Sequence, residues 1–226
     1  MRISISQPTL FPWLGYFDII KKSDIFVFLD NVKFEKRNWQ MRNRLKEANK
    51  LDEHEVWIQV PTHKTESDIK IKDVEIDDKQ NWKLKHIKTF QALYGNVYHE
   101  IPFLKKLYDK EWKQLSDFNI FFITECCKFL GIDTCIKKAS DLNVSGKKSE
   151  LILNICKQLN ASEYLSTIGS KEYLEKDKDS FSKSNIDITY HEYNHPNYKQ
   201  KGNQFIPQLS ILDLLFNENE NSKKYF

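Results

Sequence analysis

The sequence predicts an α/β fold with a Rossmann-like, mostly parallel sheet and a helical insertion or cap. Short apolar or β-branched runs alternate with helical patterns near both ends of the chain, which is the element order of α/β proteins. The run Ile25 to Leu29 is apolar throughout, as expected for a strand covered on both faces. Helical patterns dominate the middle of the chain. We therefore expect one domain over 1–226, with 80–130 as a helical cap or insertion within it.

The first thirty residues predict a β-α-β unit. Ile3 to Ser6 is β-branched and reads as a strand, and Pro8 and Pro12 then forbid a helix until Gly15, because proline fixes φ and restricts the residue before it. The loop from Gln7 to Trp13 and the residue Asp30 thus both follow strands. In open α/β sheets, ligands bind at this carboxyl edge. The same prolines and aromatic residues are also compatible with a loop that is only packed and rigid.

The remaining elements follow from periodicity and from turn residues. Gly131 is expected to end a helix, Ser210 to cap one, and the polar stretch 145–149 to act as an N-cap, since it lacks the leading glycine and the spacing of a P-loop. No GxGxxG follows the first strand, which argues against a dinucleotide cofactor. We expect strands at 55–60, 69–76 (with a bulge), 132–136, 164–167 and 186–193, and helices at 15–20, 81–94, 102–112, 115–130, 149–159 and 211–216.

Composition excludes several classes of protein. The net charge of +3 supplies no general basic field of the kind that drives non-specific nucleic-acid binding. The four cysteines form no CxxC and have no histidine at ligand spacing, so neither a metal site nor a disulfide framework is expected. No signal peptide or membrane-spanning run is recognised, and we expect a cytoplasmic chain with reduced thiols and no membrane insertion.

Positive charge is concentrated between Lys33 and Lys46, where six basic residues stand against the single acid Glu35. A solvated surface is the usual explanation of a basic run. This run also contains Asn38, Trp39 and Asn43, a mixture of amide donors, guanidinium groups and a flat indole that suits a phosphate and a sugar or base. The mixture favours a binding site over a plain charged surface.

Two further regions carry candidate residues. His86 shares one face of the helix 81–94 with large aromatic side chains, so it is either a core histidine or a base that works near pH 7. The strand-loop-helix at 164–173, which contains Ser166, is a second place where a sugar or phosphate could meet backbone N–H groups. The loop His195 to Gln200 follows a predicted strand and is rich in hydrogen-bonding groups, including Tyr198.

These residues together resemble the WbqC-like protein family, and the resemblance extends over nearly the whole chain. The resemblance implies a role in O-antigen or related surface-glycan assembly, beside enzymes that make nucleotide-linked amino sugars. The matching residues are Gln7-Pro8, Pro12-Trp13, Gly15-Tyr16-Phe17, Ser23-Asp24, Asp30, Phe34, Asn38-Trp39, Arg42-Asn43-Arg44, Val60-Pro61, Trp82, Lys85-His86, Tyr94, Tyr164-Leu165-Ser166, Gly169, Tyr173, HPNYKQ and FIPQLSILDLLFN.

The resemblance and the residues lead to one functional hypothesis. The chain would be an enzyme of surface-polysaccharide biosynthesis that transfers an acyl or aminoacyl group to the amine of a nucleotide-linked amino sugar. No tightly bound cofactor is expected, and the donor would be an acyl thioester on coenzyme A or a carrier protein. In this hypothesis Lys36, Arg42 and Arg44 hold the diphosphate, Trp13, Tyr16 and Trp39 stack on base or sugar, and Gln7, Asn38 and Asn43 read hydroxyl groups, with Ser166, Tyr198 and Gln200 as further substrate contacts.

Proton transfer in this hypothesis falls to His86 or His195, with Asp30 orienting the base or the amine. The sequence leaves open which histidine acts. It also leaves open a non-catalytic module that binds a nucleotide sugar or a partner glycan enzyme through the same residues. Single-stranded nucleic-acid binding is a weaker alternative, because the basic residues form one patch instead of a long track.

Overall fold

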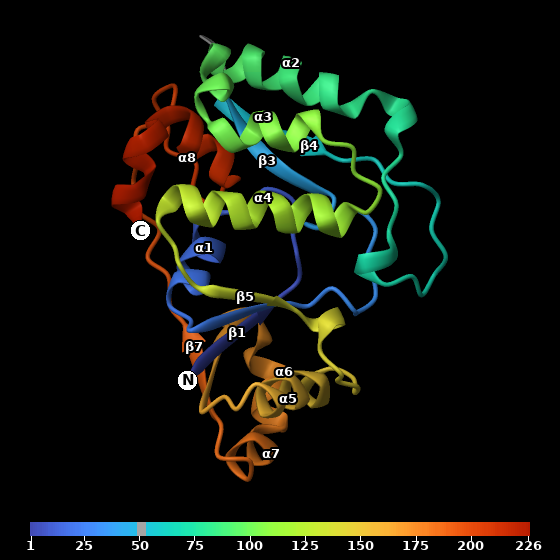
Figure 1. The fold of residues 1–226 in the computed structure, drawn as a ribbon. Coiled ribbons are helices and arrows are strands. Elements are labelled where there is room, and N and C mark those ends of the chain that lie inside the picture. The colour runs from blue at the N-terminus through green and yellow to red at the C-terminus, as the bar shows by residue number, and fades with distance from the viewer. Residues whose placement is uncertain (49–52) are drawn as a thin grey trace.

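The computed structural model describes residues 1–48 and 53–226. Its centre is a five-stranded sheet with the strand order β5-β2-β1-β6-β7, and every neighbouring pair is parallel (Figure 1). The α/β class predicted from the sequence is therefore confirmed. The strands are β1 (Arg2–Ser6), β2 (Ile25–Phe28), β5 (Cys135–Lys138), β6 (Glu163–Thr167) and β7 (Asp187–His191).

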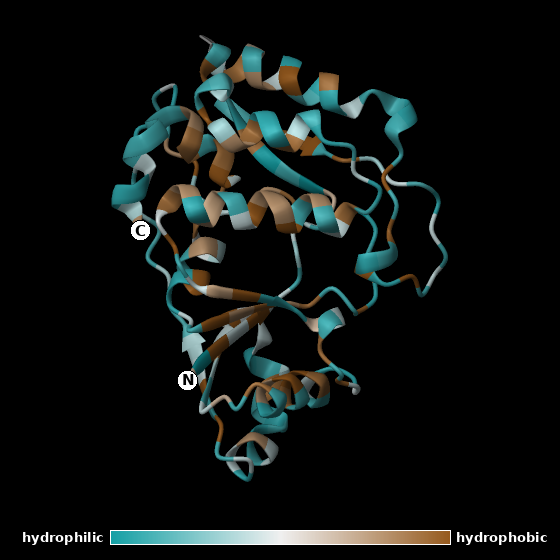
Figure 2. Cartoon of the chain, in the orientation of Figure 1, coloured by the Kyte–Doolittle hydropathy of each residue, from teal (hydrophilic) through white to brown (hydrophobic). Residues whose placement is uncertain are grey.

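Helices cover both faces of this sheet, as the apolar run of β2 required. Phe26 and Phe28 point into one buried cluster and Val27 into the other, because side chains alternate along a strand. Figure 1 shows α1 and α4 on one face and α5, α6 and α7 on the other, and Figure 2 shows the hydrophobic strands between them. These helices are α1 (Leu14–Lys21), α4 (Leu115–Leu130), α5 (Ser149–Gln158), α6 (Lys171–Lys176) and α7 (Lys178–Ser182).

An upper layer lies beyond α1 and α4, and much of it is inserted between β2 and β5 (Figure 1). The hairpin of β3 and β4 is antiparallel and separate from the parallel sheet. One continuous hydrophobic cluster joins this layer to the sheet, since it includes Ile58, Phe90, Phe216 and Phe28. The elements of the layer are β3 (Arg42–Ala48), β4 (Glu53–Gln59), α2 (Trp82–Tyr94), α3 (Pro102–Asp109) and the C-terminal α8 (Ile211–Glu218).

Short 3-10 turns complete the secondary structure of the described residues. Gly131, at φ 75°, ends α4 as expected, and the Ser210 hydroxyl accepts a hydrogen bond from the Leu212 amide at 3.2 Å as the cap of α8. The 3-10 helices are η1 (Ile71–Asp73), η2 (Asp78–Gln80), η3 (Gly95–Glu100), η4 (Ala139–Asp141), η5 (Ile168–Ser170) and η6 (Asn219–Tyr225).

Two local predictions were wrong, and one strand was not predicted. The range 69–76 is not a strand, because the apparent register slip at Lys72-Asp73 is a 3-10 turn that buries Ile71 and Val74 together. The second half of the basic segment is strand β3, which pairs with the strand expected at 55–60. The 145–149 stretch gives no side-chain cap to α5, since Lys148 occupies the cap position without such a bond.

The order of the strands creates a switch point at the centre of the sheet. The chain leaves β1 toward β2 and β5 on one side, whereas β6 and β7 extend the sheet on the other. Connections that leave in opposite directions open a crevice at the carboxyl ends of the two central strands, and ligands of open α/β sheets bind there. In this chain the residues at that edge are the loop 7–13 after β1 and the turn η5 after β6.

Two buried amides tie the loop 7–13 to the rest of the fold. Asn43, on β3, donates its Nδ2 protons to the carbonyl oxygens of Leu10 (2.9 Å) and Phe11 (2.8 Å). Asn119, on α4, donates to the carbonyl oxygen of Pro8 at 3.2 Å. Because Leu10 and Phe11 are fully buried, these carbonyl groups have no access to water and need protein donors.

We predict that Asn43→Ala lowers the free energy of unfolding by about 3 kcal/mol, because it leaves two buried carbonyl groups unpaired. Urea denaturation measures this change. The exposed Asn197 supplies the control, and Asn197→Ala should stay within about 0.5 kcal/mol of the parent. Equal stabilities of the two variants would contradict the role given to Asn43.

Candidate functional site

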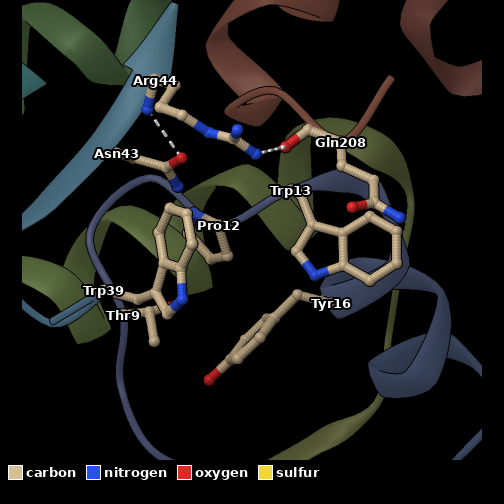
Figure 3. A pocket seen from close by; sticks show the side chains of 8 residues that line it. All are labelled: Thr9, Pro12, Trp13, Tyr16, Trp39, Asn43, Arg44 and Gln208. Carbon is tan, nitrogen blue, oxygen red and sulfur yellow. Dashed lines mark hydrogen bonds between the residues drawn. The ribbon is translucent and has the colours of Figure 1, made fainter. Parts of the chain in front are cut away.

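Two adjoining cavities open at the carboxyl edge of the sheet, and we call them together the double cleft. The indole cavity has a volume of about 300 Å³ and the switch-point cavity about 310 Å³. They share Thr9 and Tyr16 in their walls. The indole cavity is also lined by Pro12, Trp13, Trp39, Asn43, Arg44 and Gln208 (Figure 3), and the switch-point cavity by Ile5, Ser6, Gln7, Leu29, Ile152, Tyr164, Thr167, Ser170 and Tyr173.

Trp13 owes its position to Gly15. A Cβ atom at position 15 would lie 2.3 Å from Cη2 of the Trp13 indole, so only glycine lets this ring lie against the first turn of α1. The edge of Tyr193 supports the ring, with the two centroids 5.2 Å apart. The indole N–H of Trp13 has no partner among the described residues, and it is available to a ligand.

Four side chains of the hairpin region form a stack that we call the Arg–Trp ladder: Arg42, Trp57, Trp39 and Arg44. The guanidinium of Arg42 lies 4.3 Å from the centre of the Trp57 ring, and that of Arg44 lies 5.4 Å from the Trp39 ring. The two indoles are 5.8 Å apart, and they are 45% (Trp39) and 50% (Trp57) exposed. Cation–π contacts hold the guanidinium groups in place without using their N–H donors.

Arg44 is the cation of the indole cavity. Its Nη1 donates to both carboxylate oxygens of Glu55 at 2.7 and 2.8 Å, and Nη2 donates to the carbonyl oxygen of Gln208 at 3.4 Å (Figure 3). Its Nε is buried and has no partner among the described residues. The Glu55 contact neutralises much of the guanidinium charge. Arg44 therefore offers a ligand a hydrogen-bond donor in a fixed position more than a free positive charge.

Tyr16 and Gln7 shape the wall between the two cavities. The Tyr16 hydroxyl donates to the Gln7 carbonyl oxygen at 2.8 Å, and burial raises the pKa of Tyr16 well above its usual value, so it stays a neutral phenol. The Gln7 side chain accepts from Nε2 of Gln40 at 2.6 Å. In Figure 3 the indoles of Trp13 and Trp39 stand on opposite sides of the cavity, with Tyr16 between them.

The two candidate histidines lie in different places, and neither lines the double cleft. His195 packs parallel to Trp13 with the ring centroids 6.3 Å apart. Its Nδ1 donates to the Pro196 carbonyl oxygen at 2.9 Å, and its Nε2 accepts from the Gln208 amide at 3.2 Å. Burial lowers its pKa, so the ring is neutral at pH 7. His195 thus contacts two residues of the indole cavity.

His86 lies in the core of the upper layer. Its Nε2 and Nδ1 are each 2.8 Å from a partner, the Gln59 carbonyl oxygen and the Tyr108 hydroxyl. With Nε2 as the donor, Nδ1 accepts from Tyr108, and both nitrogens are satisfied. Burial lowers the pKa of His86 to about 4. This is the environment of a neutral core histidine.

Asp30 contacts neither histidine. Its two carboxylate oxygens accept from the amide and the hydroxyl of Ser140 at 2.9 and 2.6 Å, which ties the end of β2 to the turn η4 after β5. The orienting role predicted for Asp30 therefore has no histidine contact to support it.

Tyr198 and Gln200 belong to a buried polar network that anchors the C-terminal loop. The Tyr198 and Tyr94 hydroxyls both donate to Asp213, at 2.8 and 2.6 Å. Gln200 donates to the Tyr198 hydroxyl at 3.1 Å and exchanges two hydrogen bonds with the backbone of Ile206. Burial raises the pKa of Asp213. These side chains support the fold around the cleft and do not line it.

The outcome for the predicted site residues is mixed. Those that line the double cleft are Gln7, Trp13, Tyr16, Trp39, Asn43 and Arg44. Lys36 and Asn38 are on the surface, where they bond Thr65 and Glu35. Ser166 is buried, and its hydroxyl donates to that of Tyr164, which lines the switch-point cavity. Sequence reasoning missed Thr9, Thr167, Ser170, Tyr173 and Gln208. The first four lie in the two loops that it had singled out, and Gln208 lies in the C-terminal motif FIPQLSILDLLFN, to which no site role was given.

Among the described residues, no group of histidine, cysteine and carboxylate side chains has the arrangement of a metal site. None of the described helices combines the length and apolar character needed to cross a bilayer.

A parallel Rossmann-like sheet with a cleft at its switch point places the chain in the α/β class. The chain belongs to the WbqC-like protein family, whose family model matches residues 7–225. It is 33% identical to the uncharacterised protein Rv1507c of Mycobacterium tuberculosis over 230 aligned residues. The alignment covers 99% of this chain and 96% of that protein. No solved structure matches the chain. The family resemblance predicted from the sequence is thus confirmed.

The environment of His86 predicts a pH dependence of stability. Its pKa is about 4 in the folded chain and near 6.5 when unfolded, so the unfolded state binds the proton more tightly and stability falls as the pH drops from about 6.5 to about 4. The loss from this group is about 3 kcal/mol. Urea denaturation at pH 7, 5 and 4 should therefore show a steeper acid loss for the parent than for His86→Gln. Parallel losses would contradict the assignment.

Proposed function

We propose that the chain works in surface-polysaccharide biosynthesis by binding a nucleotide-linked amino sugar in the double cleft and transferring an acyl or aminoacyl group to the sugar amine. The observation that carries this proposal is the pair of adjoining cavities at the switch point, which differ in their walls. A ligand made of two dissimilar parts, a nucleotide and a sugar, matches such a pair.

The walls support this division of the ligand. The switch-point cavity combines an apolar floor with hydroxyl groups of Ser6, Thr167 and Ser170, which suits a nucleoside. The indole cavity places Trp13 and Trp39 on opposite sides of a space that Arg44 and Gln208 border. Indole faces stack on sugar rings, and the free indole N–H of Trp13 can donate to a hydroxyl or phosphate oxygen.

The transfer step needs a neutral amine and an acyl donor. The amine nitrogen bonds to the carbonyl carbon of a thioester, the C–S bond breaks, and the thiol leaves with a proton while the amine gives up its own. In the proposal, Nε2 of His195 takes the amine proton. That nitrogen is unprotonated at pH 7, and the amide that now donates to it belongs to Gln208, whose φ of 58° is unfavourable for a residue other than glycine. Movement of Gln208 would open Nε2 to the indole cavity.

A second candidate function is a non-catalytic module that binds the same nucleotide sugar. One observation favours it: no histidine, cysteine, lysine or carboxylate is among the described residues that line the double cleft. A binding module needs no proton acceptor there, whereas the enzyme needs the movement of Gln208.

The binding part of the proposal predicts a thermal shift. One of a panel of UDP-, dTDP-, GDP- and CMP-linked amino sugars should raise the Tm of the parent by several degrees, because it binds only the folded chain. Arg44→Ala should reduce this shift. Arg2→Ala is a matched control, since Arg2 also pairs with a glutamate, Glu163 at 2.9 Å, but lies at the amino end of β1. The absence of a shift with every nucleotide sugar would overturn the proposal.

The catalytic part predicts a separation of turnover from binding. His195→Gln should lower kcat about 100-fold and leave the KM for the nucleotide sugar nearly unchanged, because the base acts only in the reaction step. The acid limb of the pH profile of kcat should disappear in this variant. His99→Gln, at an exposed position, serves as the control. A His195→Gln variant with parental kcat would contradict the role, and ligand binding without turnover with any donor would favour the binding module.

A further inference from the structure

A third cavity, which we call the β4–α2 cavity, lies beside the double cleft and takes no part in the binding proposed so far. Its volume is about 240 Å³. It is lined by Trp57, Ile58, Gln59, Pro61, Gln80, Trp82, Lys85, His86 and Thr89, which come from the end of β4 and the residue Pro61 after it, from the turn η2, and from α2. One wall is therefore Trp57 of the Arg–Trp ladder, whose other indole, Trp39, lines the indole cavity.

Arg42 is an unpaired cation that stacks on Trp57, one wall of this cavity. It pairs across the hairpin with Gln59, and its guanidinium is stacked on Trp57 at 4.3 Å. Among the described residues it has no carboxylate partner and no hydrogen bond from its side chain. Stacking fixes the plane of the guanidinium and leaves its N–H donors free, which is the arrangement that binds a phosphate with little loss of side-chain entropy.

Lys85 adds a second positive charge from the opposite wall. It lines the cavity from α2, and its ammonium has no partner among the described residues. No carboxylate is among the described lining residues. Two acids outside the lining are each bonded to a lining residue, since Asp78 accepts from Nε1 of Trp82 at 2.8 Å and Asp77 accepts from Nε2 of Gln80 at 2.9 Å. With Arg42 and Lys85 unpaired beside it and no carboxylate in its described lining, the cavity favours an anion.

Trp57 indicates what accompanies the phosphate. It is half exposed, an unusual condition for so large an apolar side chain, and it offers a flat surface beside the two cations. A phosphate next to a stacking surface is the recognition pattern of a nucleotide. The double cleft already accounts for one nucleotide in the proposed function, so this second pattern calls for a second ligand.

We infer that the β4–α2 cavity binds the adenosine phosphate end of the acyl donor, as carried by coenzyme A, with the base on Trp57 and phosphate groups on Arg42 and Lys85. The donor arm would pass Trp39 and bring its thioester carbonyl to the amine in the indole cavity. This inference rests on the proposed function for the identity of the ligand as an acyl donor, but the anion site itself does not depend on it.

Isothermal titration of the purified chain with coenzyme A tests the inference. Coenzyme A should bind the parent. Its affinity should be about tenfold lower for Arg42→Gln and severalfold lower for Lys85→Gln, because each variant loses a charge-assisted contact. Lys88→Gln is the matched control, since Lys88 is an exposed lysine on the same helix outside the cavity. It should bind like the parent.

Two further titrations locate the site and the group recognised. Saturating nucleotide sugar should leave the affinity for coenzyme A unchanged, since the two ligands occupy different cavities. 4′-Phosphopantetheine, which lacks the base, should bind at least tenfold more weakly than coenzyme A, because it cannot stack on Trp57. Each titration uses variants whose Tm equals that of the parent.

Several results would overturn the inference. These are no binding of coenzyme A to the parent, equal affinities of Arg42→Gln and Lys88→Gln, competition between coenzyme A and the nucleotide sugar, or equal binding of 4′-phosphopantetheine. Failure of the proposed function looks different: no nucleotide sugar binds, while coenzyme A still binds in a manner that depends on Arg42.

Discussion

The architecture around the cleft depends on how the buried backbone of the loop 7–13 is satisfied. This loop leaves the central strand and passes beneath the upper layer, with Leu10 and Phe11 fully buried. The two prolines of the loop remove backbone N–H donors but leave all of its carbonyl acceptors. These carbonyl groups therefore need hydrogen-bond donors from other parts of the chain. Asn43 and Asn119 supply them, and the Leu10 amide donates in turn to the Trp39 carbonyl oxygen at 2.8 Å. The hairpin, α4 and the first loop are therefore held in one arrangement.

That arrangement turns a crevice common to α/β sheets into a double cleft. The switch point supplies the first cavity through β1, β6 and the loops that follow them. The hairpin supplies the outer wall of the second through consecutive residues of β3: Asn43 points inward to the loop, and Arg44 points outward to Trp39 and Glu55. One strand thus fixes the loop with one face and, with the other, presents guanidinium groups that stack on the indoles of Trp39 and Trp57.

The sequence predicted the parts of the fold that depend on local patterns. The apolar run of β2, the proline-rich loop and the helical spacing after Gly15 were enough to place β1, α1 and β2, and the mixture of Trp39, Asn43 and Arg44 located one wall of the cleft. The 69–76 range was misassigned because four apolar residues around a 3-10 turn imitate the alternation of a strand. The pairing of β3 with β4 depends on tertiary contacts that a single sequence does not display.

The roles of individual side chains were harder to predict from the sequence than their positions in the fold. A histidine that shares a helix face with aromatic residues gives the same sequence pattern whether it is a catalytic base or a core residue. Only the two hydrogen bonds of His86 in the folded structure distinguish these two roles. Tyr198 and Gln200 are residue types that are common in binding sites, but here they form hydrogen bonds with Asp213 and Ile206. Gln208 lies in the C-terminal motif that resembles the family, but only the folded structure shows that it borders the indole cavity.

Amide hydrogen exchange, measured with and without the nucleotide sugar that gives the largest thermal shift, tests most directly that the double cleft is the ligand site. We expect slower exchange in 9–16, 39–44 and 167–173, which surround the two cavities, and unchanged exchange in α7 and the outer turns of α3. Protection confined to segments outside the cleft would show that the ligand binds elsewhere and would contradict the account.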